Sequence, residues 1–143
     1  RLADFDAEQR ANSAAIDRAL RAPGAAEPAS ALGGYAVYHD AYQYFEQQFG
    51  LTHALALVHD PERSPSIREL AETRAALARA RPACLLVEPD SDPRLIDTVL
   101  NSAQLRRVEV DILGYAVADG EQGYTRLIRG FVDDLTRCMT VAP

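Results

Sequence analysis

The chain has 143 residues, of which 48% are hydrophobic and 25% charged, and its formal net charge is −6. This composition excludes a disordered or low-complexity protein, and the length suits one hydrophobic core. The acidic balance excludes a nucleic-acid-binding surface, because phosphate binding needs clustered basic side chains and the 15 arginines are dispersed among carboxylates.

The first predicted element is an amphipathic helix over residues 2–20, in which apolar side chains recur at helical spacing. Pro23, Gly24 and Pro28 then indicate a linker, so we expect one unit over residues 1–32 and a packed domain over residues 33–143. No apolar run is long enough to cross a bilayer, and no secretory signal segment is present. Because the sequence begins with arginine rather than methionine, we expect a processed chain or a piece of a larger protein.

Strands and helices alternate four times after the linker. Short apolar strands are predicted at residues 35–38, 53–58, 84–88 and 107–113, and helices at residues 40–49, 66–80, 93–103 and 123–139. Within the helix at 66–80, Ile67, Leu70 and Leu77 are expected to share one face. Such alternation implies parallel strands joined by right-handed crossovers. The predicted fold class is therefore α/β, with a single four-stranded parallel sheet that has helices on both faces.

Polar side chains follow every predicted strand. In an open parallel sheet, ligands bind at the carboxyl ends of the strands, where the loops and helix N-termini gather. The side chains at these ends are His39, Asp40, His59, Asp60, Glu88, Asp90, Asp92 and Asp111. Imidazole and carboxylate together suit Zn²⁺ or Mn²⁺, whereas carboxylates alone suit Mg²⁺ or Ca²⁺. His39 is therefore the residue that decides which metal this edge would take.

Each histidine also has a structural interpretation. A lone histidine such as His39 is often a helix cap or a hydrogen-bonded residue at the rim of a sheet. His59 is interpreted as a turn residue before Pro61, and His53 as a solvent-facing residue at the start of a strand. These alternatives leave the role of His39 open.

The acidic cluster at Glu88, Asp90 and Asp92 is typical of Mg²⁺ or phosphotransfer sites. However, no phosphate-binding glycine loop and no G-x-S-x-G nucleophile motif occurs in the sequence. Acidic side chains before Pro93 also favour the N-terminus of the helix predicted there. We therefore favour helix capping over catalysis for these acids.

Cys84 and Cys138 do not belong to a C-x-x-C motif, which argues against thioredoxin-like redox chemistry and against a zinc knuckle. Their spacing leaves two buried thiols and a structural disulfide equally open.

Four stretches resemble, in this order, the C-terminal lobe of the ZnuA-type periplasmic zinc-binding proteins of ABC importers. They are YAVYHDAYQYFEQQFGL, CLLVEPDSDPRLIDTV, VEVDILG and GYTRLIRGFVDDLTRCM. The resemblance covers most of residues 33–140, and its most specific part is H-D-A-[YF]-x-Y-F. It implies a periplasmic solute receptor rather than an enzyme, and it places residues 1–32 just after the long helix that joins the two lobes of the family.

The resemblance also implies a metal site between two lobes. In the family, Zn²⁺ is held mainly by histidines, two from the N-terminal lobe and one at the position of His39. Manganese-type members add a carboxylate at the position of Asp111, and its participation varies in zinc members. Asp40 or Glu88 would supply the acceptor that fixes the tautomer of His39.

The same resemblance implies a disulfide between Cys84 and Cys138, which indicates an oxidising periplasm. The implied partners are an N-terminal lobe, which this sequence does not contain, and the membrane permease of an ABC importer. Because one imidazole and one carboxylate cannot complete a zinc shell of three or four ligands, we expect this chain alone to bind zinc weakly or not at all. Self-association through the uncovered cleft face is a further expectation.

Two alternative functions remain. A manganese or iron receptor of the same family is the nearer one, although histidine rather than glutamate at position 39 and the cysteine pair favour zinc. From another class, a small Mg²⁺-dependent α/β hydrolase would use the strand-end carboxylates of Glu88, Asp90, Asp92 and Asp111.

Overall fold

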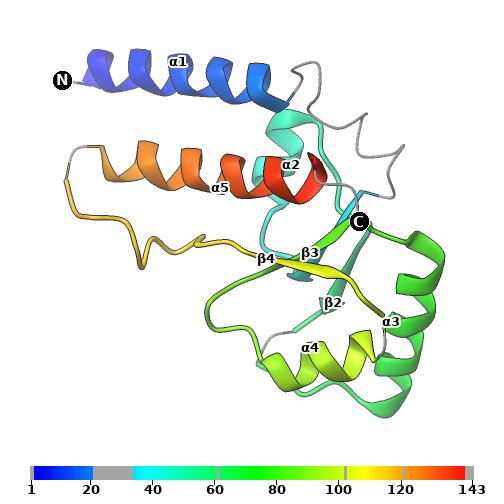
Figure 1. Cartoon of the computed structure of the whole chain (residues 1–143). Coiled ribbons are helices and arrows are strands. Elements are labelled where there is room, and N and C mark those ends of the chain that lie inside the picture. Colours follow the sequence, from blue (N-terminus) through cyan, green and yellow to red (C-terminus); the bar gives the residue numbers. More distant parts are fainter. Residues whose placement is uncertain (1, 21–33, 61, 102, 121, 141–143) are drawn as a thin grey trace.

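A computed structural model of the chain describes residues 2–20, 34–60, 62–101, 103–120 and 122–140 (Figure 1). The elements in chain order are α1 (Leu2–Leu20), β1 (Tyr35–His39), α2 (Gln43–Phe49), β2 (Leu55–Val58), α3 (Ile67–Ala80), β3 (Cys84–Val87), α4 (Pro93–Leu100), β4 (Arg106–Glu109) and α5 (Gly123–Thr140). The predicted linker lies outside the described residues. Among the described helices, none combines the length and the apolar character that a membrane span requires.

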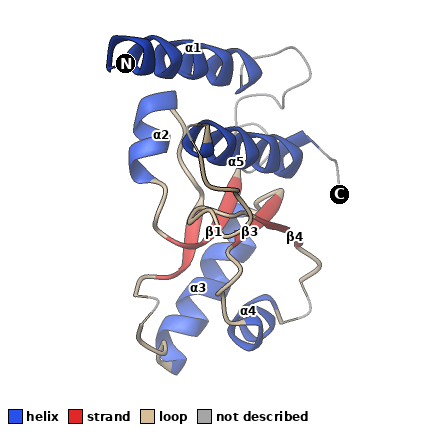
Figure 2. Cartoon of the chain, turned by 90° about the vertical axis from the view of Figure 1, so that its left-hand side faces the viewer, coloured by secondary structure: helices blue, strands red, loops and turns tan. Residues whose placement is uncertain are grey.

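The four strands form one parallel sheet in the order β2-β1-β3-β4. Figure 1 shows α3 and α4 on one face of this sheet and α5 on the other, with α1 outside α5. In the turned view of Figure 2, α2 lies beside α5 on the same face. These observations confirm the predicted α/β class, the four-stranded parallel sheet and the N-terminal helix.

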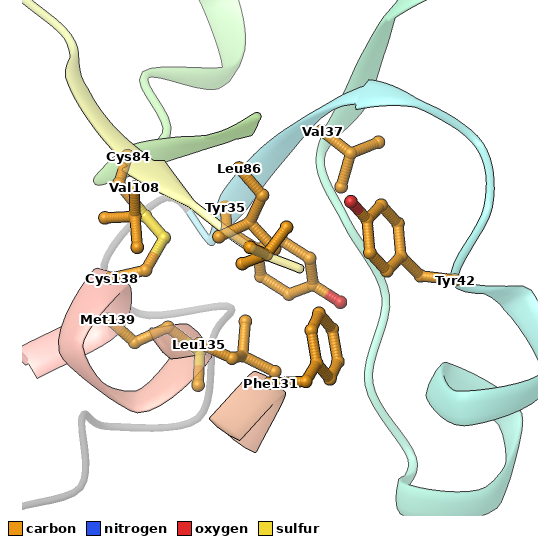
Figure 3. Close-up of a cluster of buried hydrophobic side chains, with 11 residues drawn as sticks. Tyr35, Val37, Tyr42, Cys84, Leu86, Val108, Phe131, Leu135, Cys138 and Met139 are labelled. Carbon is orange, nitrogen blue, oxygen red and sulfur yellow. A yellow bond between two sulfur atoms is a disulfide. The ribbon is translucent and has the colours of Figure 1, made fainter. Parts of the chain in front are cut away.

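Both faces of the sheet are buried, as near-continuous apolar strands predict. Successive side chains of a strand point to opposite faces, so alternate residues enter two separate hydrophobic clusters. Tyr35 and Val37 contribute to the cluster under α5, which also contains Phe131 and Leu135 (Figure 3). The opposite cluster joins the other strand residues to α3 and α4; it contains Ala36, Tyr38, Leu85, Leu77, Ile96 and Val99.

A disulfide between Cys84 and Cys138 connects β3 to α5 inside the cluster under α5 (Figure 3). Both cysteines are fully buried, and their Cα atoms lie 5.6 Å apart, within the usual range for a disulfide. Of the two possibilities that the spacing left open, the structure contains the disulfide.

Helix α1 packs on the outer side of α5. Ile16 is buried against Phe49 of α2 and Val132 of α5. A polar contact accompanies this packing, because the buried Asn12 Nδ2 donates a hydrogen bond of 3.0 Å to Thr125 Oγ1. Helix α1 therefore contacts the α/β unit through both apolar and polar side chains.

Several predicted boundaries differ from the structure. The fourth strand ends at Glu109 rather than at residue 113, because the chain turns into a loop that Asp111 caps. Helix α2 begins at Gln43 rather than at residue 40, after a turn in which Ala41 N donates to His39 O. Ile67 was expected on one helix face with Leu70 and Leu77, and it is the first residue of α3, but it is 88% exposed and so does not join the buried part of that face.

Candidate metal-binding site

Strand pairing brings His39 and Glu88 together at the carboxyl end of the sheet. Strands β1 and β3 are neighbours, with Val37 opposite Leu86, so His39 lies level with Glu88 two residues further along. The His39 Nδ1 atom lies 3.4 Å from Glu88 Oε2. Their side chains differ in exposure, at 26% for His39 and 3% for Glu88. The structure therefore places a buried carboxylate behind a partly exposed imidazole.

The two ring nitrogens of His39 have different surroundings. Nδ1 is buried and has no hydrogen-bond partner, because its contact with Glu88 lacks hydrogen-bond geometry. Nε2 makes no hydrogen bond to any described residue. The exposed quarter of the ring consequently lies away from Nδ1, on the side that includes Nε2.

The carboxylate of Glu88 is held by two hydroxyl groups. Tyr42 donates its hydroxyl proton to Oε1, and Ser91 Oγ lies 3.1 Å from Oε2. Ser91 Oγ also accepts a hydrogen bond of 2.9 Å from the backbone N–H of Glu88. One carboxylate oxygen thus faces Tyr42, while the other faces both Ser91 and His39.

Tyr42 is itself buried and fixed in orientation. Its ring stacks on Phe131 of α5, with the ring centroids 5.4 Å apart and the planes inclined by 10°. Burial, followed by the neighbouring Glu88 carboxylate, raises the pKa of Tyr42 above its ordinary value, so its hydroxyl stays a proton donor. The sequence indicates Tyr42 only as a core aromatic, since helical periodicity carries no information about the partner of its hydroxyl.

The remaining acids of the predicted cluster have separate roles. Asp92 caps α4 by accepting a hydrogen bond of 2.9 Å from Arg94 N, which confirms the capping interpretation for that residue. The same interpretation is wrong for Glu88, which is buried beside His39, and Asp90 is exposed. Asp40 is also exposed, and its side chain makes no hydrogen bond or ion pair with the described residues.

Asp111 caps the loop that follows β4. Its two carboxylate oxygens accept the backbone N–H groups of Gly114 at 2.7 Å, Tyr115 at 3.0 Å and Ala116 at 2.8 Å. These backbone donors, led by Ala116, lower the pKa of Asp111. Strand β3 lies between β1 and β4, so the strands that lead to His39 and Asp111 are separated by roughly 10 Å.

No group of three or more histidine, cysteine, aspartate or glutamate side chains that could hold a metal ion occurs among the described residues. The four carboxylates of the hydrolase alternative have different surroundings. Glu88 is buried and Asp90 is exposed, whereas Asp92 caps α4 and Asp111 caps the loop after β4. The geometry therefore gives that alternative no support.

A second buried network surrounds Glu46, which the sequence does not single out. Glu46 Oε1 accepts hydrogen bonds from the Tyr35 hydroxyl at 2.5 Å and from His53 N at 2.8 Å, and His53 Nδ1 lies 2.9 Å from the same oxygen. The prediction of a solvent-facing His53 is wrong, since its side chain is only 17% exposed. The sequence signal that could have revealed this network is a glutamate on the apolar face of a helix, between Tyr42 and Phe49.

His59 is exposed in a bend, in agreement with its predicted turn position.

Comparison with known proteins places this site in context. A family model described as "Zinc-uptake complex component A periplasmic" matches residues 7–138. The high-affinity zinc uptake system protein ZnuA of Brucella suis is 32% identical over 106 residues, which cover 74% of this chain and 32% of that protein. The Haemophilus ducreyi protein of the same description is 29% identical over 107 residues, covering 75% of this chain and 34% of that protein.

Solved structures agree in fold. The laminin-binding protein Lmb of Streptococcus agalactiae, described as an adhesin with metal transporting activity, superposes with a TM-score of 0.73 at 18% identity and covers 95% of this chain and 50% of its own. The solute-binding protein FpvC of Pseudomonas aeruginosa in complex with Ni²⁺ has a TM-score of 0.72 at 19% identity, with coverage of 95% and 48%. The chain thus spans about one third of the curated relatives and about half of the solved structures. Since the family model matches nearly the whole chain, the chain belongs to the ZnuA family of periplasmic, non-enzymatic solute-binding receptors for divalent metals.

Proposed function

We propose that this chain is the C-terminal lobe of a periplasmic receptor that captures Zn²⁺ between two lobes and delivers it to the permease of an ABC importer. The observation that supports the proposal most is the pairing of His39 with the buried Glu88 carboxylate at the sheet edge where ligands bind. The half coverage of the solved structures supports a second lobe as the partner that completes the site.

In this proposal His39 binds the metal through Nε2. A neutral imidazole carries its proton on one nitrogen, and metal-bound histidines usually donate that proton to a carboxylate or carbonyl. Glu88 lies next to Nδ1 and suits that role, whereas Asp40 is exposed and makes no hydrogen bond or ion pair with the ring. Asp111 would have to give up backbone hydrogen bonds before it could coordinate a metal.

The choice of zinc over other divalent metals belongs to the proposal as well. Relatives near 30% identity are described as zinc uptake proteins, whereas a structure with the same fold holds Ni²⁺. Histidine rather than glutamate at position 39, together with the cysteine pair, favours zinc over manganese or iron. Competition between Zn²⁺ and Mn²⁺ for a receptor that contains both lobes tests this choice, and tighter Mn²⁺ binding would refute it.

The first experiment measures zinc binding by the 143-residue chain alone. Because three or four ligands are needed for tight binding, isothermal titration should show affinity no tighter than micromolar. The residual binding should disappear in His39→Ala and persist in the control His59→Ala, whose histidine is exposed in a bend. Submicromolar binding at one stoichiometric site would contradict the proposal.

The second experiment uses a receptor that contains both lobes. There, His39→Ala should weaken Zn²⁺ binding by more than about tenfold, the lower range seen even when only a residue behind a ligand is lost. An unchanged zinc affinity would show that His39 is not a ligand.

The uncovered face supports a further part of the proposal. Leu113 and Tyr115 lie in the loop after β4 at the same sheet edge and are 65% and 69% exposed. We propose that the second lobe covers this face, and that the chain alone self-associates through it. Sedimentation analysis should therefore show dimers that Tyr115→Ser weakens, and a monomer at all concentrations would contradict self-association.

A further inference from the structure

The contacts around Glu88 point to a role for Tyr42 that its place in the core does not explain. Glu88 is 4% exposed, and His39 is the only basic side chain within ion-pair distance of it among the described residues. A buried carboxylate is costly unless hydrogen bonds compensate its lost hydration. In this site the compensation comes from the hydroxyl groups of Tyr42 and Ser91.

These two hydroxyl groups also determine how the carboxylate is oriented. Tyr42 occupies Oε1, so Oε2 is the oxygen that faces His39 Nδ1. Tyr42 cannot easily follow a rotation of the carboxylate, because its ring is buried and stacked on Phe131. Ser91 is bonded to the backbone N–H of Glu88 and contacts the same oxygen that faces His39. The packing of Tyr42 on Phe131 of α5 therefore fixes the hydroxyl that holds Oε1 of Glu88.

The buried and unpartnered Nδ1 of His39 indicates what this orientation serves. At 3.4 Å from Oε2, a small rotation of the ring would complete an Nδ1–H···Oε2 hydrogen bond. That bond would hold the proton on Nδ1 and leave the lone pair of Nε2 available on the exposed side of the ring.

We propose that Tyr42 is a positioning residue for the metal site, which orients Glu88 so that His39 presents Nε2 to a divalent cation. The proposal rests on the proposed function, because it assumes that His39 is the ligand. In this role Tyr42 does not contact the metal but acts on it through two other side chains, Glu88 and His39.

The chain contains a matched control for this role. Tyr35 is also a buried tyrosine whose hydroxyl donates to a buried glutamate, Glu46, and that glutamate also contacts a histidine, His53. Tyr42→Phe and Tyr35→Phe each remove one buried hydrogen bond of the same kind. Only Tyr42→Phe removes a bond to the carboxylate behind His39.

The experiment follows the 143-residue chain by NMR. Long-range ¹⁵N–¹H spectra of the imidazole report the tautomer of His39, and titration with Zn²⁺ followed through the backbone amides of residues 38–42 reports binding. In the unsubstituted chain and in Tyr35→Phe, His39 should carry its proton on Nδ1. In Tyr42→Phe both tautomers should be populated, and zinc affinity should fall by about tenfold.

The outcomes separate the two proposals. If His39→Ala leaves the zinc-dependent amide shifts unchanged, the proposed function fails. If His39→Ala abolishes them while Tyr42→Phe retains the tautomer and affinity of the unsubstituted chain, only the role of Tyr42 is refuted. Equal loss of affinity in Tyr35→Phe would also refute it, since a general structural effect would then explain both variants. Should Tyr42→Phe fail to fold, Phe131→Leu keeps the Tyr42 hydroxyl but removes the ring on which Tyr42 stacks, and it should produce the same mixture of tautomers. An unchanged tautomer of His39 in Phe131→Leu would then refute the role of Tyr42.

Discussion

Buried Glu46 receives polar contacts from two segments that flank α2. The Tyr35 hydroxyl comes from β1, and the backbone N–H and ring of His53 come from the segment before β2. Burial, followed by the hydrogen bond to Glu46, raises the pKa of Tyr35 above its ordinary value, so this hydroxyl remains a donor. The carboxylate of Glu46 in α2 therefore connects β1 to the segment that precedes β2.

Loss of this carboxylate should destabilise the fold. Glu46→Ala leaves the Tyr35 hydroxyl and the His53 N–H without partners in the interior, which should lower the free energy of unfolding by roughly 3 kcal/mol. Urea denaturation measures the change. The neighbouring Gln47→Ala is the control because Gln47 is exposed, and an effect of Glu46→Ala no larger than this control would contradict the assigned role.

Glu69 illustrates a pH-dependent contribution at the surface. Hydrogen bonds from Arg63, followed by those from Ser66, lower the pKa of Glu69 from 4.5 to about 2. Because the folded-state pKa lies below the unfolded value, the stabilisation is fully present above about pH 4.5 and is lost as the pH falls towards 2.

Two measurements check this pH dependence. NMR titration of the Glu69 side-chain carboxyl should give a midpoint near the lowered value, and Glu69→Gln should remove this part of the acid dependence of unfolding. Glu62→Gln is the control, since Glu62 is an exposed acid nearby. A Glu69 midpoint at the ordinary value of a glutamate would contradict the prediction.

Helix α3 is an element whose ends are visible in the sequence. Ser66 accepts a hydrogen bond from Glu69 N, and the Glu69 carboxylate accepts one from Ser66 N, which together form a capping box. The pattern serine-x-x-glutamate before an apolar-periodic segment predicts this start directly. At the other end, the helix stops at Ala80, with Arg81 in a left-handed conformation and Pro82 after it.

Removal of the cap should weaken α3 without changing the fold. Ser66→Ala removes the side-chain acceptor for Glu69 N and should lower the free energy of unfolding by about 1 kcal/mol. Thermal denaturation followed by circular dichroism checks this value against Ser64→Ala, because Ser64 is exposed and outside the helix. Equal midpoints for the two variants would show that the cap contributes nothing.

Other elements were predictable in kind but not in length. The fourth strand was expected to continue to residue 113 because its apolar pattern continues, yet it ends at Glu109. Asp111 explains the difference, since its carboxylate binds the backbone N–H groups of the following loop and so competes with further strand pairing. Ile67 fits the helical period but is exposed, because periodicity does not reveal that the first residue of α3 lies outside the cluster that Leu70 and Leu77 join.

The whole molecule is held together across its layers by the disulfide between Cys84 and Cys138, which closes a loop of 54 residues between β3 and α5. A chain-entropy estimate gives a stabilisation of roughly 4 kcal/mol for a loop of this length. The double variant Cys84→Ala/Cys138→Ala should therefore have a free energy of unfolding lower by roughly 4 kcal/mol, which urea denaturation measures as a lower transition midpoint.

The control for the disulfide prediction is the unsubstituted chain under reducing conditions. Once its disulfide has been reduced, it should unfold close to the double variant, whereas under oxidising conditions it should be more stable. If the oxidised chain and the double variant unfold at the same urea concentration, the disulfide does not stabilise the fold.

The sequence by itself determined the alternation of strands and helices, and hence the α/β class and the sheet edge where ligands bind. It also determined that His39 lies at the end of the first strand, because strand ends and helix starts depend on local periodicity and capping residues. Its resemblance to a known family supplied the pairing of Cys84 with Cys138, which spacing alone left open.

Only the tertiary structure decided which side chains meet. Glu88 lies behind His39 because β1 and β3 pair in parallel, although His39 and Glu88 are 49 positions apart in the sequence (88 − 39) and local periodicity does not specify the strand order β2-β1-β3-β4. The same holds for Tyr42 beside Glu88 and for His53 beside Glu46, whose contacts depend on the packing of α2 against the sheet. Local sequence patterns specify elements, whereas the polar contacts that build a site form between elements and are determined by their packing.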